Sequence, residues 1–189
     1  MYIRIRKRVE RSIPGRDSNK CVTNNKEYTM KKQGFTLIEL MVVIVIMGIL
    51  AAVAVPKLFG MIAKSKASEV GPAAGEYVKL QDAFIAENGD WMGNFTAIGY
   101  EMQSTPTFTY ASTITAQTEA LATKADAWKA TSNVALNNCA SGSKWSLQLA
   151  KSSTGNGAAW TASYTVASGS TEADCSVLTP RFKDLTRGN

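Results

Sequence analysis

The chain has 189 residues, enough for one domain of ordinary size, with 21 basic and 15 acidic side chains and no histidine. Without imidazole, Ser-His-Asp and Cys-His nucleophiles and histidine-ligated metals are excluded. The sequence also lacks a glycine-rich phosphate loop, a CxxC pair, and HExxH and GxSxG motifs. Composition therefore predicts a protein that is not an enzyme, with no catalytic residue, metal site or cofactor.

The excess of positive charge lies in the N-terminal arm. Residues 1–34 carry ten basic and three acidic side chains, whereas the rest of the chain carries 11 basic and 12 acidic ones. The formal net charge of +6 therefore describes the arm and not the remainder of the protein. For this reason no specific nucleic-acid partner is inferred from the charge.

A long apolar run, FTLIELMVVIVIMGILAAVAV, occupies residues 35–55. At about 1.5 Å per residue it is long enough to cross a hydrocarbon core of about 30 Å. It exceeds the apolar core of about 7 to 15 residues in a secretory signal peptide, and Pro56 follows it at once. An ordinary single-pass anchor is the simplest alternative, and Lys31 and Lys32 then place the N-terminus in the cytoplasm.

Glu39 is the only charged residue in the apolar run, and neither a signal peptide nor an ordinary anchor explains it. A carboxylate within a membrane costs several kcal/mol unless it is paired, so its presence indicates a functional site. The run contains no Lys or Arg that could pair with it. The cation must come from another chain or from a new amino terminus, and a cut between Gly34 and Phe35 would create one.

The stretch KKQGFTLIEL at residues 31–40, with the apolar run, Gly48 and Pro56, resembles the N-terminal segment of type IV pilins and pseudopilins. The resemblance implies that a prepilin peptidase cuts after Gly34 and that Phe35 becomes the N-methylated first residue. It also implies that Glu39 pairs with the amine of a neighbouring subunit during assembly. Gly48 and Pro56 match positions that weaken the family's helix, although both residue types are also ordinary in membrane helices.

The function that this resemblance implies is a structural subunit of a type IV pilus, most like a type IVa major pilin, serving adhesion, twitching motility or DNA uptake. Implied partners are further copies of the chain, the prepilin peptidase, the inner-membrane assembly platform and, before assembly, inner-membrane lipid. The precursor would cross the inner membrane once, and the pilus would lie on the cell surface. The alternatives are a minor pilin and the major pseudopilin of a type II secretion system.

The expected fold is α+β, with a long N-terminal helix packed on a small antiparallel sheet. The helix would be transmembrane over residues 35–56 and amphipathic over residues 57–87, where apolar side chains recur every three or four positions. Gly71-Pro72 is expected to kink it.

Residues 88–189 are expected to form the exported β region. Alternating apolar and polar residues predict a strand at 107–110 and a hairpin over 145–166. Residues 91–102 are expected to be a connecting loop, and residues 117–136 are ambiguous between helix and loop.

The three cysteines fall on both sides of the predicted cleavage point. Cys21 lies in the cytoplasmic leader, residues 1–34. Cys139 and Cys175 would both be exported to a compartment where disulfides form, and a bond between them would close a loop near the C-terminus. Two free, buried cysteines are the alternative. The cysteine pair and the absence of an acidic calcium-ligand pattern after Asp126 favour a pilin over a pseudopilin.

The leader is longer than is usual in the family, and Met30 begins the compact leader MKKQG. We therefore expect translation to start at Met30. The intact mass of the precursor, made in a host that lacks the peptidase, checks this expectation. A mass that includes residues 1–29 would contradict it.

Overall fold

The structure is a computed structural model that describes residues 34–153 and 157–188. The expected leader up to residue 33, including Cys21 and the proposed start at Met30, lies outside the described residues. The chain divides into two units, one that ends at Met41 and one that begins at Val42.

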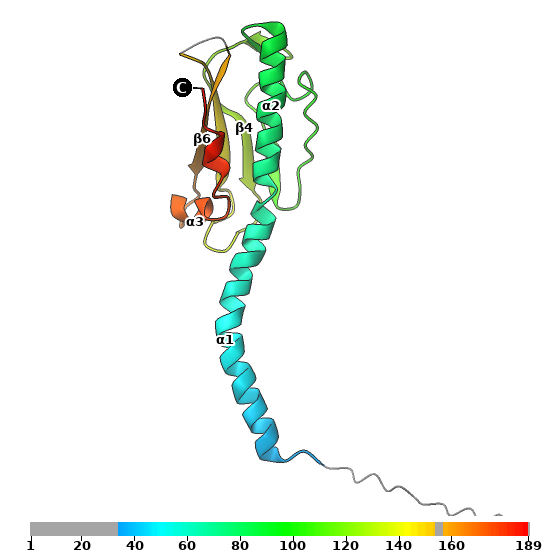
Figure 1. The fold of residues 1–189 in the computed structure, drawn as a ribbon, viewed down its shortest axis with the longest axis vertical. Coiled ribbons are helices and arrows are strands. Elements are labelled where there is room, and N and C mark those ends of the chain that lie inside the picture. Colours follow the sequence, from blue (N-terminus) through cyan, green and yellow to red (C-terminus); the bar gives the residue numbers. More distant parts are fainter. Residues whose placement is uncertain (1–33, 154–156, 189) are drawn as a thin grey trace, which may run out of the picture. The chain divides into compact units, whose positions relative to one another are not determined.

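Two helices follow one another in the first half of the chain (Figure 1). They are α1 (Leu37–Ala67) and α2 (Val70–Asn88), and only Ser68 and Glu69 separate them. Pro72 has no N–H to donate to the carbonyl of Ser68, four residues earlier, so the helical ladder is interrupted there. The interruption predicted at Gly71-Pro72 thus lies slightly before the proline rather than at it.

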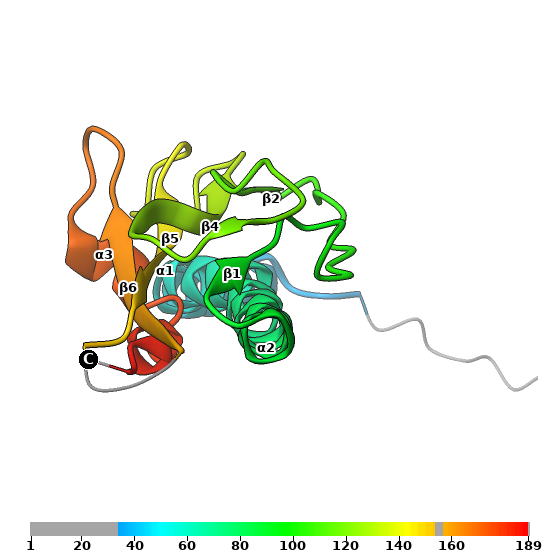
Figure 2. The same ribbon diagram turned by 90° about the horizontal axis from the view of Figure 1, so that it is seen from above.

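The main sheet has four antiparallel strands in the order β2-β4-β5-β6. Its strands are β2 (Phe108–Ala111), β4 (Lys124–Ser132), β5 (Lys144–Lys151) and β6 (Ala158–Thr165). The β5–β6 hairpin is in continuous register from Lys144↔Thr165 to Lys151↔Ala158. Helix α2 lies along one face of this sheet (Figure 2), so the predicted α+β class is confirmed.

The segment 117–136, which the sequence left ambiguous between helix and loop, is largely β-strand with short loops. It contains β3 (Glu119–Ala120), which pairs with β1 (Trp91–Met92), and then the central strand β4. The predicted loop 91–102 therefore begins with a short strand, β1. In β4 the register shifts between Lys124 and Trp128, where Asp126 adopts a left-handed φ of 53°. This bulge interrupts the alternation that identifies a strand in sequence.

Two short elements complete the fold near the C-terminus, and the sequence analysis anticipated neither of them. They are α3 (Glu172–Ser176) and the 3-10 helix η1 (Phe182–Leu185). Beyond η1, Arg187 pairs with Trp160 of β6 through two backbone hydrogen bonds of 2.7 and 3.0 Å. The tail therefore covers part of the outer edge of β6.

The core forms around Tyr77, a fully buried residue of α2. Its ring makes edge-to-face contacts with Phe95, Tyr100 and Trp160, at centroid distances of 5.6, 5.5 and 5.9 Å. Such contacts contribute about 0.5–1.5 kcal/mol each beyond the burial of apolar area. Tyr77 therefore connects α2 to the loop after β1 and to the far edge of the sheet.

Two side-chain hydrogen bonds link α2 to the sheet within the core. The indole N–H of Trp128 donates to the hydroxyl of Tyr100 at 2.9 Å, and that hydroxyl lies 3.2 Å from the carbonyl of Ala73, to which it donates. Burial raises the pKa of Tyr100 to about 12, so its hydroxyl remains a donor at neutral pH. The link ties β4 to α2 through a loop residue.

Gln81 makes a second polar link from α2, and its side chain is completely buried. Its amide donates to the carbonyl of Gly93 at 3.0 Å and accepts from the N–H of Gly93 at 2.9 Å. A β-carbon on Gly93 would lie 3.0 Å from Ile98 and 3.1 Å from both Ala97 and Phe84. These side chains would have to shift if residue 93 carried a β-carbon, so the tight packing of this loop favours glycine.

Gly93→Ala should lower the free energy of unfolding by about 1–3 kcal/mol, because the added methyl group forces the tightly packed side chains around it to shift. Gly75→Ala is the matched control, since a β-carbon at this α2 position meets no atom within 4 Å. The control should raise stability by up to about 1 kcal/mol through better helix propensity. Urea unfolding of the detergent-solubilised protein measures both changes, and equal stability of the two variants would contradict the packing argument.

Candidate functional site

The residues at the predicted cleavage point lie just before α1 and are exposed. The side chain of Phe35 is 78% exposed, and a β-carbon built on Gly34 meets no atom within 4 Å. Nothing in the described part of the chain therefore requires glycine at position 34. If the small side chain matters, the reason lies in another molecule that binds there.

Thr36 and Glu39 form a loose capping box at the start of α1. The N–H of Glu39 donates to the hydroxyl of Thr36 at 3.3 Å, and the N–H of Thr36 donates to the Glu39 carboxylate at 3.4 Å. Both distances are at the long end of the hydrogen-bond range. The arrangement satisfies two amide donors that a helix start leaves open, and it places a negative charge at the positive end of the helix.

The sequence analysis missed Thr36, although the pattern Thr-x-x-Glu before an apolar run is a recognisable signal for a helix start. This capping role does not exclude a role for Glu39 between chains. The cap uses weak contacts on an exposed carboxylate, which leaves Glu39 able to accept a stronger partner.

The apolar surface of α1 is uncovered within the chain. The large apolar side chains from Leu37 to Ile62 are 43–82% exposed, and Ala63 and Ala67 are the buried residues of this helix. By length and composition this part of the helix can cross a membrane. Gly48 and Pro56 both lie inside α1, which continues through them.

A comparison with known protein families matches this N-terminal segment. The family model of the prokaryotic N-terminal methylation motif covers residues 29–55. A fimbrial protein of Neisseria meningitidis serogroup B is 41% identical over 73 residues, which are 39% of this chain and 43% of that protein. The chain thus carries the N-terminal methylation motif and is similar over part of its length to a fimbrial protein.

Other relatives have related names. The type IV major pilin protein PilA of Myxococcus xanthus is 37% identical over 73 residues, 39% of this chain and 33% of that protein. The type IV major fimbrial protein FimA of Dichelobacter nodosus is 44% identical over 62 residues, 33% of this chain and 38% of that protein. The chain thus spans less than half of the length of these relatives. No solved structure matches it at a significant level.

The names of these relatives describe structural proteins of pili and fimbriae, in agreement with the expectation that this pilin-like chain is not an enzyme.

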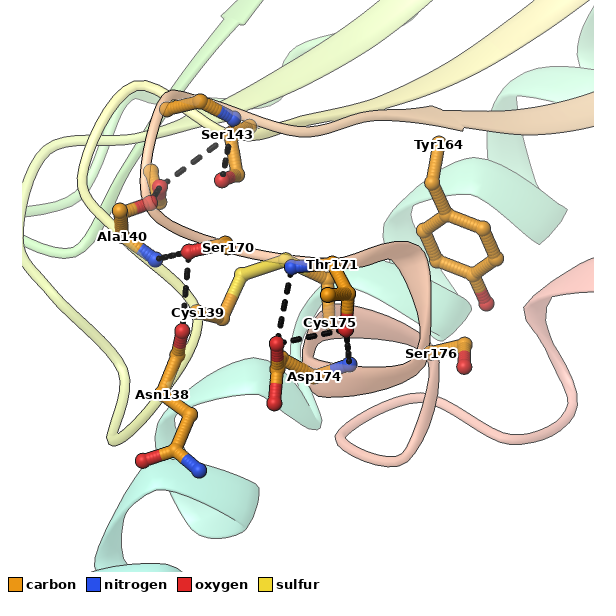
Figure 3. Close-up of a disulfide and its surroundings, with 12 residues drawn as sticks. Asn138, Cys139, Ala140, Ser143, Tyr164, Ser170, Thr171, Asp174, Cys175 and Ser176 are labelled. Carbon is orange, nitrogen blue, oxygen red and sulfur yellow. Dashed lines mark hydrogen bonds between the residues drawn. A yellow bond between two sulfur atoms is a disulfide. The ribbon is translucent and has the colours of Figure 1, made fainter.

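A disulfide joins Cys139 and Cys175, with their Cα atoms 5.0 Å apart (Figure 3). Both residues are buried, with at most 1% of their surface exposed. Ser170 holds the same region together, because its hydroxyl accepts from the N–H of Ala140 at 2.7 Å and donates to the carbonyl of Asn138 at 2.9 Å. The bond therefore links the turn after β4 to α3.

Helix α3 carries its own capping box, which positions Cys175. The hydroxyl of Thr171 accepts from the N–H of Asp174, and the Asp174 carboxylate accepts from the N–H of Thr171 at 2.8 Å. Hydrogen bonds from Thr171 hold the pKa of Asp174 below its usual range. The carboxylate is thus charged at neutral pH, which favours the helix start.

The double variant Cys139→Ala with Cys175→Ala should lose about 4 kcal/mol of stability, since the bond closes a loop with a sequence separation of 36. The measurement is urea unfolding of the full chain in detergent. As a control, wild-type protein that is unfolded and refolded in reductant should behave like the variant. A variant as stable as the oxidised wild type would show that packing alone holds α3 in place.

Proposed function

We propose that this chain is the structural subunit of a type IV pilus, a helical filament built through its N-terminal helices. The observation that carries the proposal is Glu39, a lone carboxylate at the start of an apolar helix that the chain itself leaves uncovered. The methylation motif at residues 29–55 and the pilin and fimbrial names of the relatives support it.

The proposed maturation begins with cleavage by a prepilin peptidase between Gly34 and Phe35. Both residues are exposed before the helix begins, which suits access by a protease. The cut removes the basic leader and leaves a free amine on Phe35. Methylation of this amine would preserve its positive charge.

In the proposed assembly step, Glu39 pairs with the Phe35 amine of a neighbouring copy. Moving a carboxylate into a filament core costs several kcal/mol, and an opposite charge from each neighbour offsets this cost. An error in axial register leaves both charges unpaired. The pair therefore selects one register among many that apolar packing alone would allow.

The exposed apolar side chains of α1 need two environments in succession. Before assembly, inner-membrane lipid would cover them, with the N-terminus in the cytoplasm as Lys31 and Lys32 favour. After extraction by the assembly platform, the helices of other copies would cover them. Gly48 and Pro56 lower the cost of local unwinding in the interval between them.

The pilus is favoured over a type II secretion pseudopilus because the relatives named above are pilins and fimbrial proteins. On the cell surface such a filament would serve adhesion, twitching motility or DNA uptake. Electron microscopy of sheared filaments, with mass spectrometry of their main component, tests the proposal. Long extracellular fibres of a chain that begins at N-methyl-Phe35 are expected, and confinement to the periplasm would contradict it.

Glu39→Ala and Glu39→Gln separate the two roles of this residue. Glutamine can still complete the capping box with Thr36, but it carries no charge. Both variants should be cleaved normally, and both should yield at least about tenfold fewer filaments, because a charged amine is left unpaired. Filament yield and the fraction of processed protein are measured in the same cells.

The glutamine variant decides between the two roles. Normal filament yield from Glu39→Gln, together with loss in Glu39→Ala, would show that capping is the role that matters. Normal yield from both variants would contradict any role of Glu39 in assembly.

A further inference from the structure

Residues 186–188, which we call the strap, lie along the outer edge of the main sheet. Strand β6 is the edge strand, with β5 on its other side. The N–H of Trp160 donates to the carbonyl of Arg187 at 2.7 Å, and the N–H of Arg187 donates to the carbonyl of Trp160 at 3.0 Å. This reciprocal pair is the bonding of an antiparallel ladder, so the strap takes the place of one more strand beside β6.

The residues on both sides of Arg187 extend this pairing. The hydroxyl of Thr186 accepts from the N–H of Ala162 at 3.0 Å. The carbonyl of Gly188 accepts from the hydroxyl of Ser152, just after β5, at 3.0 Å. Each residue of the strap therefore bonds to the sheet or to the residue that follows one of its strands.

Asp82 of α2 fastens the strap from the helix side. One of its carboxylate oxygens accepts from the indole N–H of Trp160 at 2.8 Å, and the other forms a salt bridge with Arg187. A single carboxylate thus connects the helix, the edge strand and the strap. Because this ion pair is partly exposed, it contributes little to stability, and its effect is to set the position of the strap.

Gly188 fits against β6 only because it has no side chain. A β-carbon on this residue would lie 2.6 Å from the carbonyl oxygen of Ala158 and 3.1 Å from the Cα atom of Ala159. Both are backbone atoms of β6, which cannot turn aside as the end of a side chain can. A substitution at position 188 therefore displaces the strap from the edge.

Without the strap, the β6 edge would be open to strand addition. An open edge presents N–H and C=O groups that another extended chain can bond. A second copy of the chain carries an identical edge, and two identical edges can pair antiparallel about a two-fold axis. Such a contact closes on itself, so it does not extend into a filament of parallel copies.

We propose that the strap blocks a strand-addition site on β6, and that displacing it lets β6 of a second copy pair there. This inference goes beyond the proposed function and does not depend on it, because the strap and the edge belong to one copy. The competing interpretation is that the strap only stabilises the sheet. That interpretation predicts no new contact between copies when the strap is displaced.

The test is Gly188→Ala in the full-length chain, purified in detergent. Gly169→Ala is the matched control, because the φ angles of the two glycines are 80° and 88° but a β-carbon on Gly169 meets no atom within 4 Å. Both substitutions strain the backbone, and only Gly188→Ala also collides with β6. Hydrogen exchange at the Trp160 amide should be at least about tenfold faster in Gly188→Ala than in the wild type, and unchanged in the control.

Contact between copies is measured by energy transfer between two labelled samples of each protein. The dyes are attached at Ser163→Cys, an exposed position on β6, with Cys21→Ser to remove the remaining thiol. Transfer should be at least about threefold higher for Gly188→Ala than for the wild type or Gly169→Ala, because strand addition brings two β6 strands together. An excess of the peptide KDLTRGN, residues 183–189, should reverse the increase by covering the edge again.

The combined results separate the interpretations. Faster exchange with increased transfer that the peptide reverses supports the proposal. Faster exchange without increased transfer shows that the strap only stabilises the sheet, and it overturns the strand-addition site. Unchanged exchange in Gly188→Ala, an equal change in Gly169→Ala, or transfer that the peptide does not reverse also overturns the proposal. Because the protein is measured in detergent, these results do not depend on whether the chain forms filaments.

Discussion

The packing of α2 against the sheet through Tyr77 is the interaction on which the folded region depends. One buried ring contacts the loop after β1 and the sheet edge at Trp160. The links from Gln81 to Gly93 and from Trp128 through Tyr100 to Ala73 add directional hydrogen bonds around it. Apolar contacts supply the driving force, and the polar links fix one arrangement of helix and sheet.

The two consecutive helices differ in how much of their apolar surface the chain itself covers. Helix α2 buries one face against its own sheet, whereas the apolar surface of α1 remains exposed. A surface this large is stable only when lipid or other protein covers it. The proposed function accounts for this exposed surface, because the apolar helix of a filament subunit is covered only when neighbouring subunits pack against it.

Sequence reasoning located the features that depend on composition or on simple periodicity. The apolar run, the isolated Glu39 and the β5–β6 hairpin belong to this group. It missed β4, because the bulge at Asp126 breaks the alternation and the alanines suggest helix. It missed α3 and η1 because elements of four or five residues are too short to show a periodic pattern of apolar side chains. The partner that Glu39 needs is not in the single chain, so neither sequence nor one folded copy displays it.

All four tryptophans of the chain come after α1 and α2, at positions 91, 128, 145 and 160. Three are fully buried in the sheet region, whereas Trp91 is 48% exposed. Tryptophan fluorescence therefore reports on the region after α2 and contains no signal from α1, either in lipid or in a filament. The three buried indoles serve as a native probe of folding, and Trp91 as a separate probe of solvent contact near the end of α2. Both can be followed in intact membranes without a label.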